Sequence, residues 1–240
     1  MRGKSLGVLF IASMGLFGAS ATAATTTDTF DGGTSSAGWS YGFDAFETSG
    51  GNPGAWLHAI NVDTFGPRIA SDPTIASDFT GDLRAKGVTS MSLDARVDAT
   101  QFPYGGEAFV MTLLLRNTRG TPEDFSDDDY AYFAGDPIPQ PGTGWLHYNF
   151  PVPSAQTTLP TGWKGGSAED PENFRPGVTW NDIITKADIV EFNYLKPGFF
   201  AIFQQWDTGV DNISVTSVPE PASMGVIAMI GAGLVARRRR

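Results

Sequence analysis

Apolar and polar side chains alternate one by one along several segments of this chain. Between Val88 and Val97, the positions Met91, Leu93, Ala95 and Val97 are apolar, whereas Ser, Asp and Arg fill the positions between them. Because successive side chains of a β-strand point to opposite faces, this period predicts a strand with one buried face. Further strands are predicted at Trp56–Val62, Phe109–Leu115, Trp145–Phe150, Ile189–Leu195, Phe199–Phe203 and Ile213–Val215.

Turn-forming residues separate these segments. The 240 residues include 29 Gly and 16 Pro, and only 18% are charged. Short strands with frequent turns predict an all-β fold, a single antiparallel β-sandwich of the jelly-roll type. One short helix is expected at Asn181–Ala187. The rim of the sandwich is expected to carry the loops Gly32–Gly38, Thr121–Asp129 and Gly162–Gly177.

Composition excludes several classes of protein. The chain has no cysteine, which excludes disulfides, thiol catalysis and cysteine-ligated zinc. Its net charge of −10 argues against nucleic-acid binding, which needs a basic surface.

The first 23 residues have the pattern of a secretory signal peptide. Arg2 and Lys4 precede an apolar run of about 14 residues. A helix needs roughly 20 apolar residues to span a bilayer, so this run is too short. Ala21 and Ala23 form an A-x-A site, so signal peptidase, acting with the Sec machinery, is expected to leave Ala24 as the first residue.

The last 23 residues have three parts in a fixed order. Pro219, Glu220 and Pro221 come first, and a Gly- and Ala-rich apolar stretch of about 13 residues follows. The chain then ends in four basic residues, Arg237, Arg238, Arg239 and Arg240. The apolar stretch can enter a membrane as a short helix, while the arginines stay on the cytoplasmic side.

This tail closely resembles the PEP-CTERM sorting signal. The resemblance implies recognition and cleavage by an exosortase, transient retention in the inner membrane, and delivery to the surface or matrix of a Gram-negative bacterium. Residues 24–217 then form the β-sandwich domain. Removing residues 1–23 and 218–240 takes away six basic residues and one acidic residue, which leaves a net charge near −15.

The domain itself resembles galactose-binding-like and laminin IV-like jelly rolls. The resemblance rests on short motifs: Thr29-Phe30-Asp31, Asn52-Pro53-Gly54-Ala55-Trp56-Leu57, and Gly209-Val210-Asp211-Asn212-Ile213. It implies a structural Ca²⁺ between the first and last strands, with Asp28, Asp31 and Asp211 as ligands. The alternative is that these carboxylates cap turns.

Aromatic side chains in loops are the expected ligand-binding groups, because sugar rings stack on exposed aromatic faces. Trp163, Tyr104, Tyr130 and Tyr132 are the candidates. The remaining tryptophans are expected in the core, namely Trp39, Trp56, Trp145, Trp180 and Trp206.

Catalytic and metal-binding patterns are weak. His58 and His147 lack metal-ligand spacing, and ordinary strand histidines are favoured. Asp124, Asp127 and Asp129 could bind calcium, but a solvated acidic loop is favoured. The paired carboxylates of a glycosidase are not apparent, and the protein is expected not to be an enzyme.

These patterns predict an exported matrix or cell-surface protein with a non-catalytic module that binds extracellular polysaccharide. One alternative is a structural or adhesive protein that acts through protein contacts. A second alternative is a glycan hydrolase.

Overall fold

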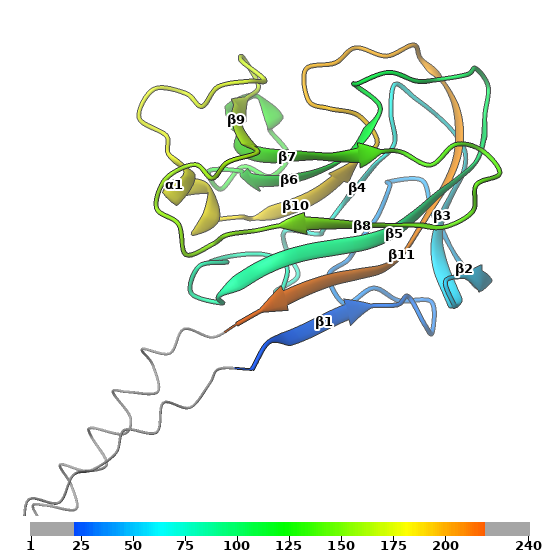
Figure 1. Ribbon diagram of the computed structural model, residues 1–240, viewed down its shortest axis with the longest axis horizontal. Coiled ribbons are helices and arrows are strands. Elements are labelled where there is room, and N and C mark those ends of the chain that lie inside the picture. The colour runs from blue at the N-terminus through cyan, green and yellow to red at the C-terminus, as the bar shows by residue number, and fades with distance from the viewer. Residues whose placement is uncertain (1–21, 219–240) are drawn as a thin grey trace, which may run out of the picture. The chain divides into compact units, whose positions relative to one another are not determined.

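The computed structural model describes residues 22–218, and Figure 1 shows that they form two stacked β-sheets. Sheet A has the order β2-β3-β11-β5-β8, with β1 also paired to β11, and sheet B has the order β4-β10-β6-β7-β9. Every pairing is antiparallel. The predicted antiparallel β-sandwich of the jelly-roll type is confirmed.

The strands of sheet A are β1 (Ala24–Asp28), β2 (Ala45–Gly51), β3 (Gly54–Thr64), β5 (Val88–Thr100), β8 (Leu146–Pro151) and β11 (Gln204–Ser217). Those of sheet B are β4 (Arg68–Ala70), β6 (Val110–Asn117), β7 (Asp129–Pro137), β9 (Trp163–Ser167) and β10 (Ile189–Asn193). A 3-10 turn covers Phe125–Asp127, and the helix α1 covers Trp180–Ile184.

The core lies between the two sheets, where alternate side chains of each strand meet. Sheet A contributes Met91, Leu93, Ala95 and Val97 of β5, the positions expected from the alternating pattern. Sheet B contributes Leu113 and other residues of β6 and β10. Trp39, Trp180 and Trp206 are each buried in this core, as expected.

The helix α1 begins one residue earlier than predicted. Thr179 donates from its backbone N–H and its hydroxyl to the Asp182 carboxylate, which holds the first turn. The helix ends at Ile184 because Ala187 leaves it to exchange two backbone hydrogen bonds with Gly81.

Three other expectations need correction. Phe199–Phe203 is not a strand, and the predicted strand at Ile213–Val215 is the end of the much longer β11. Trp163–Ser167, expected in a loop, is the strand β9. Its glycines are there because rings lie on them: a Cβ on Gly165 would come within 2.6 Å of the Phe174 ring, and one on Gly166 would overlap Tyr130.

Trp163 and Trp145 provide a test of this architecture. Trp163 packs in the core against Trp180 and Phe133, so Trp163→Ala should lower the free energy of unfolding by about 3–5 kcal/mol. Trp145 lies outside the core, and Trp145→Ala is the matched control with a loss of about 1 kcal/mol or less. Urea unfolding followed by circular dichroism measures both, and equal losses would contradict the placement of the two rings.

Candidate functional site

The outer face of sheet A, turned away from the core, carries an aromatic and cationic stack. Trp56 of β3 lies over Gly209 of β11, where a Cβ would overlap the indole ring. The Arg96 guanidinium of β5 lies 3.9 Å from the centre of the Trp56 ring. The glycine is therefore required because a side chain there would overlap the indole, and Arg96 covers one face of the ring.

Trp145 extends this stack toward the edge of the sheet. Its ring meets Trp56 edge-on, with centroids 5.5 Å apart and an interplanar angle of 89°. The carbonyl of Gly50 accepts hydrogen bonds from Trp145 Nε1 at 3.3 Å and from Arg96 Nη1 at 3.0 Å. The end of β2 is thereby fastened over the stack, while the Trp145 side chain stays partly exposed.

His58 continues the row on β3. Its ring stacks on Trp56 with centroids 4.1 Å apart. Its Nε2 lies 2.6 Å from Asp207 Oδ1 of β11 and 4.0 Å from Asp98 Oδ2 of β5. The register places Arg96 opposite Gly209 and Gly209 opposite His58, so these groups form one row across three strands.

A polar pocket of about 260 Å³ adjoins the row at Asp207. Asn61 and Asp63 of β3 and Gln205 of β11 line it, together with Gln101, which follows β5. Amide and carboxylate groups read sugar hydroxyls, and an exposed indole face supports a sugar ring. The pocket supplies the polar groups at the Asp207 end of the row, and Trp145 supplies the indole at its β8 end. This outer face, defined by Trp56, His58, Arg96, Asp98, Trp145, Gln205 and Asp207, is called the sheet A face below.

The four aromatic residues predicted from the sequence lie elsewhere. Trp163, Tyr130 and Tyr132 are buried, with exposures of 4%, 3% and 1%, so the expectation that they present exposed faces is wrong. Trp163 belongs to the main core, and the two tyrosines form a small cluster with Leu114 on the other side of sheet B. Tyr104 is half-buried, packs on Trp206, and donates its hydroxyl to the Pro139 carbonyl.

The expectation that Trp56 and Trp145 are core residues is also wrong, because neither belongs to the core between the sheets. Trp56 is 3% exposed, but Arg96, Trp145 and His58 cover it on the outer face. The alternation Trp56-Leu57-His58-Ala59 holds the signal for this position, since Leu57 and Ala59 are the buried pair. Trp56 is therefore buried by side chains of the outer face and not by the core between the sheets.

The three predicted calcium ligands separate into two groups. Asp28 Oδ2 accepts from the Ser35 hydroxyl at 2.8 Å and the Ser36 N–H at 2.7 Å, so this carboxylate fixes the loop after β1. Asp31 and Asp211 instead both lie at the turn between β2 and β3, where Asp31 Oδ1 accepts from Ala55 N–H at 3.4 Å.

Oxygen atoms converge at this turn. The point where a Cβ of Gly51 would lie is 2.7 Å from Asp211 Oδ2, 2.5 Å from the Ala55 carbonyl oxygen and 2.9 Å from that of Gly54. The corresponding point at Gly54 is 2.9 Å from Asp31 Oδ1. Calcium prefers such carboxylate and carbonyl oxygens, at 2.3–2.6 Å. The three oxygens around the Gly51 point, from Asp211, Gly54 and Ala55, are of the kind that binds calcium, whereas Asp31 Oδ1 lies at the separate Gly54 point.

Asp211 is held in a crowded acidic environment. It is fully buried, and its Oδ2 accepts from Asn52 N–H at 2.5 Å. Burial, together with the neighbouring Asp94 and Asp31 carboxylates, raises the pKa of Asp211 to about 6 despite hydrogen bonds from the Asn52 and Asn212 N–H groups. A bound cation would offset the cost of this buried charge.

Exchange of Asp211 for asparagine tests the calcium site. In chelator, Asp211→Asn should unfold below the wild type, because its amide can accept from only one of the Asn52 and Asn212 N–H groups. In Ca²⁺ the difference should widen, since only the wild type gains binding free energy, about 2.7 kcal/mol at a hundredfold excess over Kd. Scanning calorimetry measures both, with Asp28→Asn as a control that loses equally in both conditions. Equal gains from Ca²⁺ in the wild type and Asp211→Asn would contradict the site.

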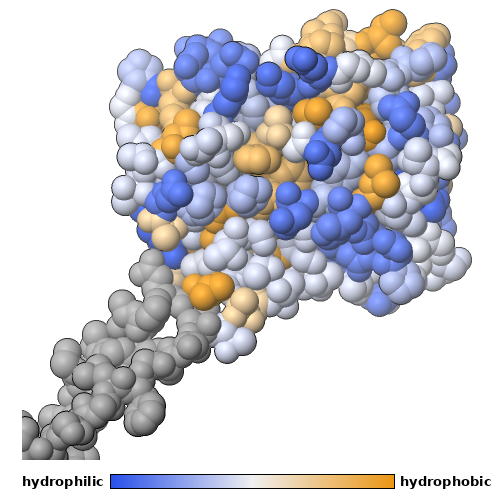
Figure 2. Space-filling model, in the orientation of Figure 1, coloured by the Kyte–Doolittle hydropathy of each residue, from blue (hydrophilic) through white to orange (hydrophobic). Residues whose placement is uncertain are grey.

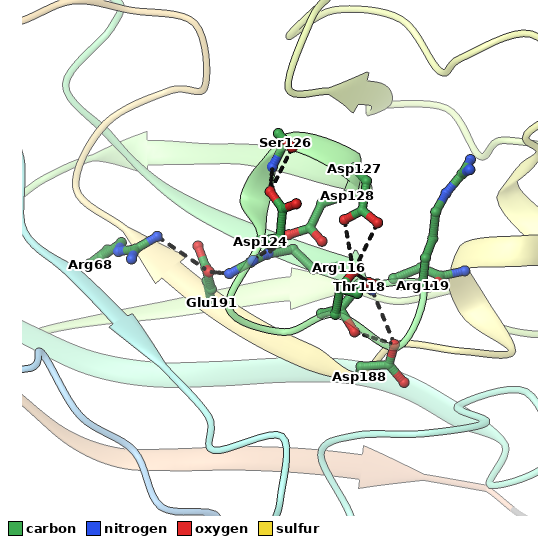
Figure 3. Close-up of polar contacts among 12 residues, drawn as sticks. Arg68, Arg116, Thr118, Arg119, Asp124, Ser126, Asp127, Asp128, Asp188 and Glu191 are labelled. Atoms are coloured by element: carbon green, nitrogen blue, oxygen red, sulfur yellow. Dashed lines mark hydrogen bonds and ion pairs between the residues drawn. The ribbon is translucent and has the colours of Figure 1, made fainter.

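The acidic run after Thr121 is solvated in its first half, where Glu123 and Asp124 are exposed, but its last two residues are not. Asp128 and Asp129 are buried, and Figure 3 shows the ion pairs of this region. The buried Arg116 guanidinium donates to both Asp128 and Glu191, and Arg119 donates to Asp129 at 2.7 Å. The other two acidic residues considered as calcium ligands have local partners, Ser126 for Asp124 and Thr121 for Asp127.

Replacement of Arg116, the cation that Asp128 and Glu191 share, tests how much this network contributes to stability. Arg116→Met leaves Asp128 buried without its cation and leaves Glu191 with only the exposed Arg68 at 3.7 Å, which should cost about 3–5 kcal/mol of unfolding free energy. The control is Glu172→Gln, which breaks the exposed pair with Lys164 and should leave the urea midpoint unchanged. Similar midpoints for the two variants would contradict the buried network.

The residues of the predicted sorting signals, from Pro219 to Arg240, lie outside the described part of the chain, as does Ala21. Among residues 22–218, no helix is long and apolar enough to cross a membrane.

No protein-family model and no curated protein matches the chain. Two solved structures are similar to it. The L4b domain of human laminin alpha-2 shares 13% identity at a TM-score of 0.35, over 67% of this chain and 85% of that one. A carbohydrate-binding module specific for non-crystalline cellulose, CBM28, shares 13% identity at a TM-score of 0.33, over 78% and 90% of the two chains. At this identity, neither structure assigns a ligand to this chain.

Proposed function

We propose that this chain is an exported, exosortase-processed surface or matrix protein whose β-sandwich binds uncharged polysaccharide on the sheet A face. The observation that carries the proposal is the row of Trp145, Arg96 and His58 beside the polar pocket. The row crosses three strand spacings, about 14 Å, which gives an extended rather than a point-like contact surface.

Charge selects the class of polysaccharide. The sheet A face carries Asp98 and Asp207, and the adjoining pocket carries Asp63, against the single cation Arg96. The net charge near −15 of residues 24–217 acts in the same direction. An acidic polymer would be repelled, whereas neutral sugars offer hydroxyl groups that amides and carboxylates can bind.

The module is proposed to bind without catalysis. Asp98 is held by Arg96 at 2.8 Å, and Asp207 is held by His58 at 2.6 Å. A glycosidase needs two carboxyl groups that are free to act on the two sides of the glycosidic bond. These partners support a binding role over hydrolysis.

Export rests on the patterns at both ends of the chain. Signal peptidase and the Sec machinery would act before Ala24, and the exosortase near Pro219–Pro221. The strand β1 begins at Ala24 and β11 ends at Ser217, and these two residues are paired. Both proposed cuts therefore lie just beyond the last rung of one ladder, and neither removes a strand.

A second candidate function, adhesion through protein contacts, is favoured by a surface that we call the phenyl patch: Phe65, Phe199, Phe200, Ile202 and Phe203. Phe200 is 80% exposed and Ile202 63%. Figure 2 shows apolar surface at the top of the molecule, where the β10–β11 loop lies in Figure 1. Exposed apolar patches of this kind mark contact surfaces.

Affinity electrophoresis of residues 24–217 through gels containing neutral or acidic polysaccharides tests the proposal. Retardation is expected in a neutral polysaccharide, and Trp145→Ala and Gln205→Ala should each weaken it by about 1–2 kcal/mol, the effect of removing one stacking or hydrogen-bonding group. Phe200→Ala, an exposed aromatic away from the sheet A face, is the matched control.

Retardation that Phe200→Ala abolishes and Trp145→Ala preserves would contradict the sheet A face. Unretarded migration together with self-association in the ultracentrifuge would favour adhesion. Release of reducing ends from the polysaccharide would favour a glycan hydrolase.

A further inference from the structure

Three metal-ligating groups meet on the sheet A face. His58 of β3, Asp98 of β5 and Asp207 of β11 offer one ligand atom each, and these atoms all lie within 4.8 Å of one another. Among residues 22–218, this is the group of histidines and carboxylates that meets that distance. The three backbones are neighbouring strands of one sheet, so the ligands sit on a rigid frame.

We propose that His58, Asp98 and Asp207 form a binding site for a divalent transition-metal ion such as Zn²⁺. Zinc takes imidazole nitrogen and carboxylate oxygen, and three protein ligands leave a fourth position for water. Imidazole selects such ions over Ca²⁺ and Mg²⁺, which prefer oxygen alone. The site is therefore chemically distinct from the oxygen-lined turn at Gly51.

The histidine ring is prepared for metal binding through Nε2. Stacking on Trp56 fixes the plane of the ring, and the His58 side chain is 13% exposed. The other nitrogen, Nδ1, is buried without a hydrogen-bond partner and lies 3.6 Å from Glu47 Oε1. A metal on Nε2 would displace the hydrogen that Nε2 and Asp207 share, and it requires the ring proton on Nδ1, which faces the negative charge of Glu47 at a distance longer than a hydrogen bond.

The charge around the three ligands attracts a cation, and the site has access to solvent. Asp98, Asp207 and Glu47 outweigh the single positive charge of Arg96, which contacts Asp98 Oδ2, the oxygen that lies 4.0 Å from His58 Nε2. The polar pocket includes Asp207 in its lining, so at least one of the three ligands is open to solvent. Attraction and access thus coincide at one point of the face.

The second histidine of the domain provides an internal control. His147 Nδ1 lies 2.7 Å from Asp94 Oδ1, a pair similar to that of His58 and Asp207. Asp94, however, also accepts from the side chains of Asn52 and Asn212, and the His147 side chain is 62% exposed. It has one carboxylate rather than two, so we expect no comparable affinity there.

Calorimetric titration of the full chain in detergent with ZnCl₂, in saturating Ca²⁺, tests the site. One binding event is expected. His58→Gln and Asp207→Asn should abolish it, because each removes a ligand, and His147→Gln should retain it. Near-UV circular dichroism confirms that each variant is folded.

Co²⁺ gives a second readout, because a tetrahedral nitrogen and oxygen site produces intense visible absorption bands. These bands should appear with the wild type and His147→Gln and be missing with His58→Gln. Absence of Zn²⁺ binding by the wild type would overturn the proposal, as would equal binding by folded His58→Gln. Neither result bears on retardation by polysaccharide, which is measured without Zn²⁺.

Discussion

β11 pairs with β5 along most of its length, and its other edge is shared first by β3 and then by β1. This one strand therefore sets the register of three others. It also carries the groups on which the outer face depends: Asp207 beside His58, Gly209 beneath Trp56, and Asp211 at the β2–β3 turn. A register slip of one residue would turn all three toward the core, so the face and the sheet are specified together.

Much of the fold follows from local patterns. The strands β5, β6, β8 and β10 were predictable, because their side chains alternate or form buried runs that depend on few partners. The strand β9 was not predictable, because two adjacent glycines locally favour a turn. Only the tertiary structure shows that the rings of Phe174 and Tyr130 lie over them. Phe199–Phe203 shows the opposite error, since strongly apolar residues stand in an exposed loop. In both cases a tertiary contact, or the lack of one, overrides the local preference.

The site was less predictable than the fold. Alternation places Trp56 and His58 on one face of β3, which the sequence does reveal. The partners of His58 come from positions about 40 and 150 residues later, and only the register of three strands brings them together. Tyr130 and Tyr132 are a second case in which tertiary contacts decide the outcome. Their position next to an acidic run suggested exposure, but both are buried. Arg116 instead binds Asp128, so the end of that run is buried beside the sheet while its beginning stays exposed.

The pairing of Ala24 with Ser217 decides how the domain responds to force. Tension applied between the two ends would open the β1–β11 ladder one rung at a time, like a zipper, and each step would break few hydrogen bonds. A load carried from the sheet A face to the end of β11 would run along that strand instead, and would strain its rungs with β5 and β1 together in shear. The same domain would thus resist force weakly when it is pulled by its two ends, and strongly when it is pulled between the sheet A face and the end of β11.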